Sequence, residues 1–246
     1  MPERPSPTAS RRITPADNTT VESPTDPHRG TVIAVYGTRA DTGVPVVAAS
    51  LASAVRRQVT DDVVFAELES RPSRAGKRPR APRGSRAVAD TSVEQIVIPG
   101  TDAALVRRND GVWTLAMTRG RGAGVGDAKS VITALDAMRD RFPVSVAQLG
   151  HQLSERTLAA FDAADRILLV TEGSVTSLRG VQRVLRLCRR LNYPDEKMCV
   201  VAKSVDSPGS LAAPDIAAVL KRELFWRIPV GSSTDVDGLA QKLLDV

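Results

Sequence analysis

One short loop of this 246-residue chain has the position and part of the composition of a phosphate-binding site. It runs from Gly37 to Pro45, between an apolar β-branched segment and an alanine-rich segment with helical spacing. Such a loop binds phosphate when glycines let backbone N–H groups converge on the anion. A lysine after the last glycine then reaches the phosphates, and a serine or threonine holds Mg²⁺. Here Gly43 is followed by Val44 and by a proline without an N–H. The loop therefore has the placement of a phosphate site without its chemistry.

Short β-branched runs alternate with helical patterns along most of the chain. We expect strands at 31–37, 62–68, 111–117, 143–149, 165–171, 197–205 and 225–230. We expect helices at 44–58, 128–142, 154–164, 177–191 and 213–224. Strands that alternate with helices pair in parallel through right-handed crossovers. The fold class predicted is α/β, a three-layer doubly wound and mainly parallel sheet, whose ligands bind at the carboxyl ends of the strands.

Composition divides the chain into a tail and one domain. Residues 1–29 contain six prolines and clusters of Ser and Thr, which predicts a disordered tail before a domain at 30–246. The 42% of hydrophobic residues suffices for a core. No apolar run approaches the roughly 20 residues that span a bilayer, and the N-terminus lacks the apolar segment of a secretory signal. We therefore expect a cytoplasmic protein, peripheral to the membrane or nucleoid only through partners.

Two segments resemble a known family. The helix after Gly43 reads VPVVAASLASAV, and residues 153–191 read LSERTLAAFDAADRILLVTEGSVTSLRGVQRVLRLCRRL. With the apolar strand before the loop, they resemble the MinD/ParA family of deviant Walker ATPases. The second segment is similar to the branch that localises pilus-assembly and septum-site machinery. The resemblance covers residues 31 to about 230 and implies a P-loop NTPase fold.

The same resemblance indicates what the first loop has lost. The family's signature lysine corresponds to Arg39, its phosphate-binding lysine to Val44 and its magnesium-binding hydroxyl to Pro45. Its first two glycines correspond to Ala40 and Asp41, and a carboxylate there would repel phosphate. An arginine fork is also no equivalent of a compact ammonium. The family's glycines at the strand end and before the helix are retained as Gly37 and Gly43.

The later nucleotide motifs also depart from the family pattern. Glu67 and Glu69 match a D-x-D pair near the γ-phosphate, with longer arms. Gln148 matches a Walker B-like aspartate and lacks the anion that acts through water on Mg²⁺. Lys203 matches an asparagine that reads adenine. The resemblance therefore implies a degenerate nucleotide site, without catalytic residues, a metal or a resident cofactor; binding of ATP with Mg²⁺ is the alternative.

Basic residues gather in two places that suit an anionic partner. Residues 71–86 hold seven of the chain's cations and no acid, so that the rest of the chain carries a net charge of −1. The seven are Arg71, Arg74, Lys77, Arg78, Arg80, Arg83 and Arg86. Helical spacing also aligns a stripe of Arg179, Arg183, Arg186 and Arg190. We weigh binding of DNA or an acidic partner against a solvated loop and helix face.

Four other features could suggest a binding or catalytic site, but a structural role explains each of them better. A glycine-rich stretch before the 128–142 helix resembles a phosphate loop, but two residues separate its last glycine from its lysine, which favours a flexible loop over an anion site. The glycines, lysine and serine concerned are Gly122, Gly124, Gly126, Lys129 and Ser130. His151 is expected to be a loop histidine, and Cys188 and Cys199 small core residues rather than a disulfide or metal site. Residues 238–246 are expected to cap the core.

These observations predict a pseudo-ATPase that localises or scaffolds other proteins. The branch resemblance implies a face-to-face dimer, here independent of nucleotide or formed with another family member. It also implies partners in secretion, pilus or division machinery. Two alternatives remain: an ATPase of the same family with residual activity, and a nonspecific DNA-binding protein that acts through the basic loop and the arginine stripe.

Overall fold

The structure, a computed structural model, describes residues 29–68, 95–97, 103–117, 127–204, 209–230 and 235–245. Its strands are β1 (Thr31–Gly37), β2 (Val63–Glu67), β3 (Gln95–Val97), β4 (Ala103–Arg107), β5 (Val112–Met117), β6 (Val144–Gly150), β7 (Arg166–Glu172), β8 (Met198–Lys203) and β9 (Trp226–Ile228). Its α-helices are α1 (Val44–Gln58), α2 (Ala128–Arg139), α3 (Glu155–Ala163), α4 (Val175–Arg190), α5 (Ala213–Leu220) and α6 (Asp235–Leu244). Two short 3₁₀ turns are η1 (Ala40–Thr42) and η2 (Asp195–Lys197).

All the described strands form one sheet, in the order β3-β4-β5-β2-β6-β1-β7-β8-β9. The pairs from β5 to β9 are parallel, which confirms the predicted mainly parallel α/β sheet. Antiparallel pairing of β3 with β4 and of β4 with β5 adds one edge that the sequence analysis did not predict. A three-residue strand such as β3 is too short for an alternation pattern to be recognised.

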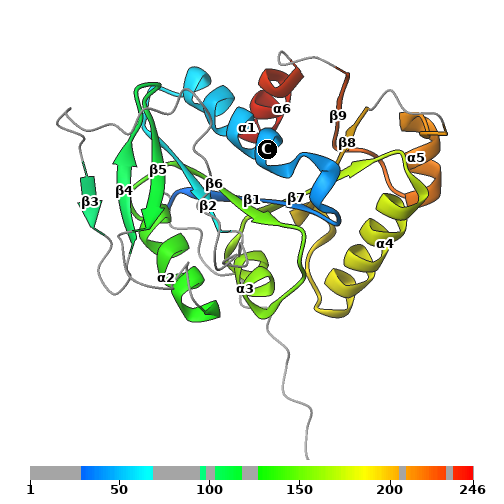
Figure 1. Cartoon of the computed structure of the whole chain (residues 1–246), viewed down its shortest axis with the longest axis horizontal. Helices are drawn as coiled ribbons and strands as arrows, with labels where there is room; N and C mark the ends of the chain where they lie inside the picture. The colour runs from blue at the N-terminus through cyan, green and yellow to red at the C-terminus, as the bar shows by residue number, and fades with distance from the viewer. Residues whose placement is uncertain are drawn as a thin grey trace, which may run out of the picture.

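Helices cover both faces of the sheet, which gives the predicted three layers (Figure 1). Helices α1 and α6 lie on one face, and α2, α3 and α4 lie on the other. Alternate residues of β1 enter the two cores: Val32 and Ala34 pack with α2–α5, while Ile33 and Val35 pack with α1 and α6. A strand buried on both faces reads as a continuous apolar run, which is why 31–37 was recognisable as a central strand.

The C-terminal segment extends further than expected. It forms the ten-residue helix α6, and Leu239 and Ala240 are fully buried against the core that contains α1. The prediction that this segment caps the core is confirmed. Cys188 and Cys199 are also buried and free, as expected.

Strand β1 lies between β6 and β7, so the loop after it opens at the centre of the sheet. The carboxyl ends of the parallel strands share this edge, with Glu67 opposite Gln148 and Glu172 opposite Lys203 in register. The topology therefore brings Glu67, Gln148 and Lys203, three positions that the sequence analysis singled out, to the edge where the loop after β1 lies.

Candidate functional site: a closed loop at the carboxyl edge of the sheet

The loop after β1 is folded as a compact turn. Gly37 ends the strand, η1 follows, and Gly43 adopts a left-handed conformation (φ 74°) before α1 begins at Val44. Pro45 occupies the first turn of α1, where its missing N–H costs no helical hydrogen bond. The local sequence thus suits this backbone, since a left-handed residue favours glycine and the first helical turn accepts proline.

Side chains fill the space inside this turn. Thr42 is fully buried, and its hydroxyl donates a hydrogen bond to the carbonyl oxygen of Arg39 at 2.9 Å. Val44 is 2% exposed and belongs to the core beneath the loop. A Cβ atom placed on Gly37 would lie 2.4 Å from both Thr42 Oγ1 and Val44 Cγ2. The loop is therefore packed against its own strand, and the Thr42 hydroxyl is hydrogen-bonded within the loop.

The two charged residues of the loop pair with each other. Arg39 Nε donates to Asp41 Oδ1 at 2.8 Å, and the second guanidinium nitrogen lies 2.5 Å from Oδ2. This hydrogen-bonded pairing lowers the pKa of the Asp41 carboxyl and raises the pKa of Arg39. Both side chains are largely exposed, so the pair sits at the rim of the loop and orients Arg39 toward Asp41.

Lys203 reaches the loop from β8. A Cβ atom placed on Gly43 would lie 2.9 Å from Lys203 Nζ, so the ammonium lies directly against this glycine. Glu172 pairs in register with Lys203 and adds an electrostatic attraction to Arg39. Lys203, at the position predicted for an adenine-reading asparagine, thus places its amine against the backbone of the loop after β1.

The remaining positions of the degenerate nucleotide motifs lie beside β1. Gln148 is 1% exposed in the middle of the sheet, opposite Val35 and Glu67. Glu67 is exposed at the end of β2, and the following residue, Leu68, donates its N–H to the Gln148 carbonyl at 2.8 Å. Glu69 lies outside the described residues.

The first loop also contacts the N-terminal half of α4, a relation that the sequence analysis missed. Thr38 Oγ1 donates to the carbonyl oxygen of Ser177 at 3.3 Å. A Cβ atom placed on Gly180 would lie 2.5 Å from Thr38 Oγ1, so only glycine fits here without a shift. The small residue in an otherwise bulky helical pattern was the available signal of this close approach.

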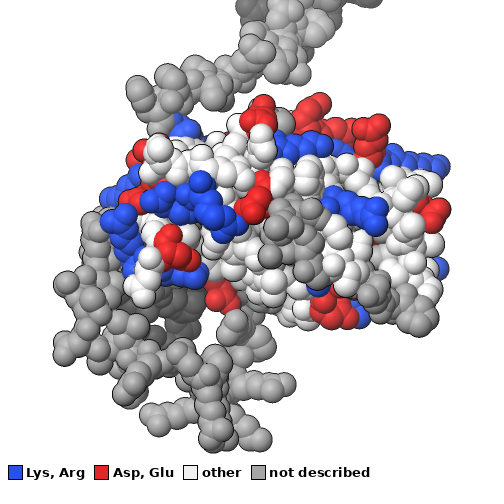
Figure 2. Space-filling model, turned by 90° about the horizontal axis from the view of Figure 1, so that it is seen from above, with Lys and Arg blue, Asp and Glu red and all other residues white. Residues whose placement is uncertain are grey.

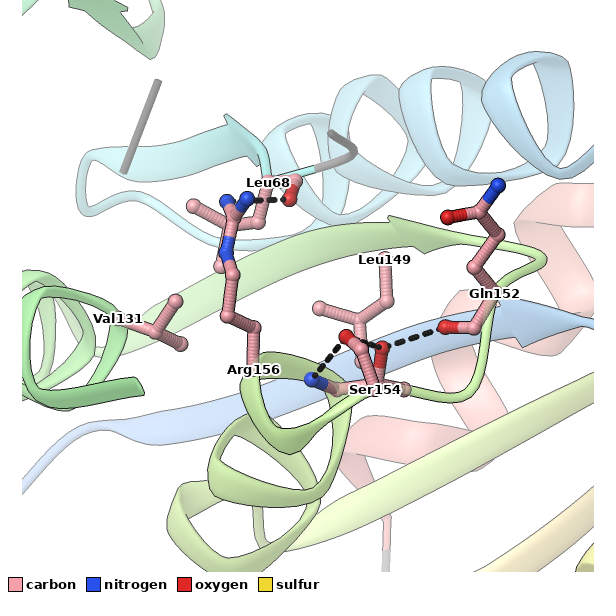
Figure 3. Close-up of a pocket in the computed structure, with 7 residues that line it drawn as sticks. Leu68, Val131, Leu149, Gln152, Ser154 and Arg156 are labelled. Carbon is pink, nitrogen blue, oxygen red and sulfur yellow. Dashed lines mark hydrogen bonds between the residues drawn. The ribbon is translucent and has the colours of Figure 1, made fainter. Parts of the chain in front are cut away.

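A small cavity of about 110 Å³ lies at the same edge, between the ends of β2 and β6 and the start of α3. Figure 3 shows Arg156 pointing across it and donating to the Leu68 carbonyl at 3.2 Å. Burial lowers the pKa of this guanidinium, and the charge of Asp127 counteracts the effect. The Thr157 hydroxyl, which also lines the cavity, donates to the Gln152 carbonyl at 2.6 Å and lies 3.1 Å from the hydroxyl of Ser154, the N-cap of α3. The sequence analysis did not identify Arg156.

His151 is a loop residue at the end of β6, as expected. Its carbonyl oxygen accepts a hydrogen bond from the Tyr36 hydroxyl at 3.1 Å. Lys129 and Ser130 belong to α2, where the Asp127 carboxylate caps the helix by accepting from the Ser130 N–H at 2.8 Å. Gly122, Gly124 and Gly126 lie outside the described residues.

The arginine stripe is present on α4. Arg179, Arg183, Arg186 and Arg190 are exposed, while Val181, Val184, Leu185 and Cys188 on the opposite side are buried. The basic loop, with Arg74, Lys77, Arg78, Arg80 and Arg83, lies outside the described residues. In the part of the chain that the structure describes, no group of three or more His, Cys, Asp or Glu side chains is arranged to hold a metal ion.

Comparison with known proteins identifies structures of the same fold. The sequence matches no family model and no curated protein. The structure resembles the MinD cell division protein of Aquifex aeolicus at a TM-score of 0.63 and 16% identity, over 88% of this chain and 98% of the other. It also resembles a ParA family ATPase from Chlorobium tepidum (TM-score 0.61, 16% identity, 89% and 92% covered). A cobyrinic acid a,c-diamide synthase from Mycobacterium smegmatis, with bound ATP analogue and magnesium, gives a TM-score of 0.61 at 20% identity (87% and 94% covered).

These likenesses and the sheet topology define a P-loop NTPase-like α/β fold for this chain. More narrowly, its fold is that of the MinD and ParA ATPases. Among the described residues, no helix is both long and apolar enough to cross a membrane.

The residues present do not fit a magnesium–nucleotide complex of the kind this fold implies. Val44, at the position predicted for the phosphate-binding lysine, is buried, and Pro45, at the position predicted for the metal-binding hydroxyl, lies in the first turn of α1. The nearby hydroxyl of Thr42 is buried and bonded within the loop. Gln148, at the position predicted for the Walker B-like aspartate, carries no charge that would act on a cation.

Proposed function

We propose that this chain is a MinD/ParA-like pseudo-ATPase that acts as a cytoplasmic localisation or scaffolding factor. The observation that carries the proposal is the packed loop, in which Thr42 and Val44 occupy the space around Gly37. Phosphoryl transfer depends on electrostatic stabilisation by a loop lysine and Mg²⁺. A fold kept without those groups suits binding other proteins better than catalysis.

We propose that the chain localises or scaffolds machinery of the pilus-assembly, septum-site or partitioning type. The fold likeness to MinD and ParA proteins and the sequence resemblance across residues 153–191 support this assignment. We propose a homodimer that needs no nucleotide, or a heterodimer with another protein of this fold. Sedimentation of the full chain with and without ATP tests the homodimer: equal dimer fractions are expected, and a dimer that appears only with ATP contradicts the proposal.

Equilibrium binding of a fluorescent ATP analogue with Mg²⁺ to the full chain tests the loss of the nucleotide site. We expect no saturable binding at near-millimolar nucleotide. A rebuilt loop is the comparison variant, with Arg39→Lys, Ala40→Gly, Asp41→Gly, Val44→Lys and Pro45→Thr. Saturable binding by the natural chain, together with Mg²⁺-dependent phosphate release that is lost on substituting Arg39, Glu67 or Glu69, would instead establish a residually active ATPase.

A second candidate function is nonspecific DNA binding. The exposed arginines of α4, a helix without an acidic residue, support it, as does the composition of residues 71–86. Binding to duplex DNA should then fall steeply with salt and weaken when residues 71–86 are deleted. Binding that is insensitive to salt, or unchanged by the deletion and by Arg179→Glu with Arg183→Glu, would exclude this mode.

A further inference from the structure

A groove of about 390 Å³ lies between α4 and α5, away from the loop described above. The two helices lie side by side at one end of the sheet (Figure 1). The groove is lined by Gln182, Leu185, Arg186, Arg189, Val219, Leu220 and Lys221. Gln182 Nε2 donates to the Val219 carbonyl at 2.9 Å, so a hydrogen bond ties the two walls together and the groove is preformed.

The charge of this groove is all of one sign. Arg186, Arg189 and Lys221 are exposed, and no lining residue is acidic. None of these three cations forms an ion pair with any residue in the described ranges; Arg186 Nε donates only to the carbonyl of Gln182, at 3.2 Å. Arg189 and Lys221 also line a neighbouring pocket that contains Asp195, Glu196 and Glu223. Because no ion pair joins them to these acids, their charge remains available to an anionic ligand.

The opposite face of the sheet provides a contrast. Seen from the side of α1 and α6, Lys and Arg side chains lie among Asp and Glu side chains (Figure 2). Arg57 of α1, for example, pairs with Asp237 of α6. Unlike Arg57, the three cations of the groove between α4 and α5 have no ion-pair partner in the described ranges, so the groove combines unpaired positive charge with a defined shape.

The floor of the groove is apolar, and its α5 side carries one exposed apolar side chain. Leu185 and Leu220 are buried beneath it, and Val219 exposes 42% of its surface on the α5 side. A ligand that uses the whole groove therefore needs apolar groups beside its negative charges. A phosphate backbone offers only the charges, whereas an amphipathic helix with acidic and apolar residues offers both.

We infer that this groove docks an acidic amphipathic segment of a partner protein. Carboxylates of the segment pair with Arg186, Arg189 and Lys221, and its apolar side chains cover Val219. The inference rests on the proposed scaffolding role, because it names the chemistry of a partner for it. It makes no use of the nucleotide loop, so a positive ATP-binding result would overturn the pseudo-ATPase proposal and leave this one standing.

The test uses the full chain and two fluorescein-labelled helical peptides of about 14 residues, roughly four turns. One peptide presents Glu on one face and Leu on the other; its twin has Gln in place of every Glu. Binding is measured by fluorescence anisotropy at low salt. We expect the acidic peptide to bind at least about tenfold more tightly than its twin, and to weaken as salt is added.

Two variants with the same charge change locate the binding. Arg186→Glu with Arg189→Glu alters the groove, whereas Arg179→Glu with Arg183→Glu alters the same helix outside it. We expect the groove variant to lose about tenfold or more in affinity and the second variant to lose about twofold or less. Circular dichroism and thermal melting confirm that both variants fold.

Several results would overturn the inference. Equal affinity for the two peptides would show that the carboxylates are not recognised. Equal losses from the two variants would assign binding to the whole arginine stripe, as nonspecific DNA binding requires. Loss of peptide binding only when residues 71–86 are deleted would assign it to the basic loop. Affinity for duplex DNA is measured with the same variants. If the groove variant weakens DNA binding more than it weakens peptide binding, nucleic acid is the occupant of the groove.

Discussion

Lys203 Nζ lies against Gly43, so that a Cβ atom on this glycine would be 2.9 Å from the amine. The contact joins the last residue of β8 to the residue before α1, across the carboxyl edge of the sheet. An ammonium at the positive end of a helix gains nothing from the helix dipole. Packing therefore places Lys203 against this glycine without help from the dipole of α1. The carboxyl edge, where open α/β sheets bind their ligands, is thus occupied by side chains of the protein itself.

The substitution Gly43→Ala tests how firmly Lys203 is held. The left-handed backbone alone should cost about 1–2 kcal/mol of unfolding free energy. The extra cost of the lysine contact should be below about 0.5 kcal/mol, because Nζ ends a flexible chain that can swing away. Gly209→Ala is the control, since Gly209 has a φ of 79° and nothing within 4 Å of a new Cβ. A much larger cost at Gly43, relieved by Lys203→Ala, would show a rigidly held amine.

The substitution Gly180→Ala tests the packing of α4 on the first loop. Alanine favours a helix over glycine by about 1 kcal/mol, but its Cβ would lie 2.5 Å from Thr38 Oγ1. We expect a net destabilisation of about 1–3 kcal/mol from overpacking, measured by urea unfolding. Adding Thr38→Gly should recover much of this loss relative to Thr38→Gly alone. A stabilising Gly180→Ala would mean that the helix stands further from the loop.

The buried hydroxyl of Thr42 should contribute measurably to stability. Thr42→Val keeps the side-chain shape and leaves the Arg39 carbonyl without its 2.9 Å donor, which should cost about 1–2 kcal/mol. Thr133→Val provides the comparison, because the Thr133 hydroxyl bonds the Lys129 carbonyl on the helix surface; it should change stability by less than about 0.5 kcal/mol. Similar values for the two variants would contradict a packed, water-free loop.

Both tyrosines should titrate abnormally in the folded protein. Burial raises the pKa of Tyr36 from 10.0 to about 12, and burial with the Asp162 hydrogen bond raises the pKa of Tyr193. Because the folded pKa exceeds the unfolded one, the stabilisation is complete below pH 10 and is lost as the pH rises through the folded value. Near-ultraviolet absorbance should show little tyrosinate in the folded chain at pH 10, where the denatured chain is half ionised. A Tyr193→Phe variant isolates Tyr36, and a transition near pH 10 in that variant would refute its burial.

The sequence by itself determined the alternation of strands and helices from β1 to β9, apart from β3 and β4, and the place of the loop. These are local properties: β-branched runs, helical spacing, glycine before a helix and proline in its first turn can each be recognised within a few residues. The absence of the lysine at Val44 and of the hydroxyl at Pro45 is equally a matter of sequence. The resemblance to MinD and ParA proteins added the fold, which the structural likenesses confirm.

Only the tertiary structure decided which side chains pack around the loop after β1. The contact of Lys203 with Gly43 joins residues 160 positions apart, and the fit of Gly180 against Thr38 depends on how α4 lies across the sheet. The burial of Thr42, the hairpin of β3 and β4, and the groove between α4 and α5 likewise follow from packing between distant segments. A local pattern fixes which face of an element is apolar, but side-chain contacts depend on which elements the fold brings together, and no local pattern records that.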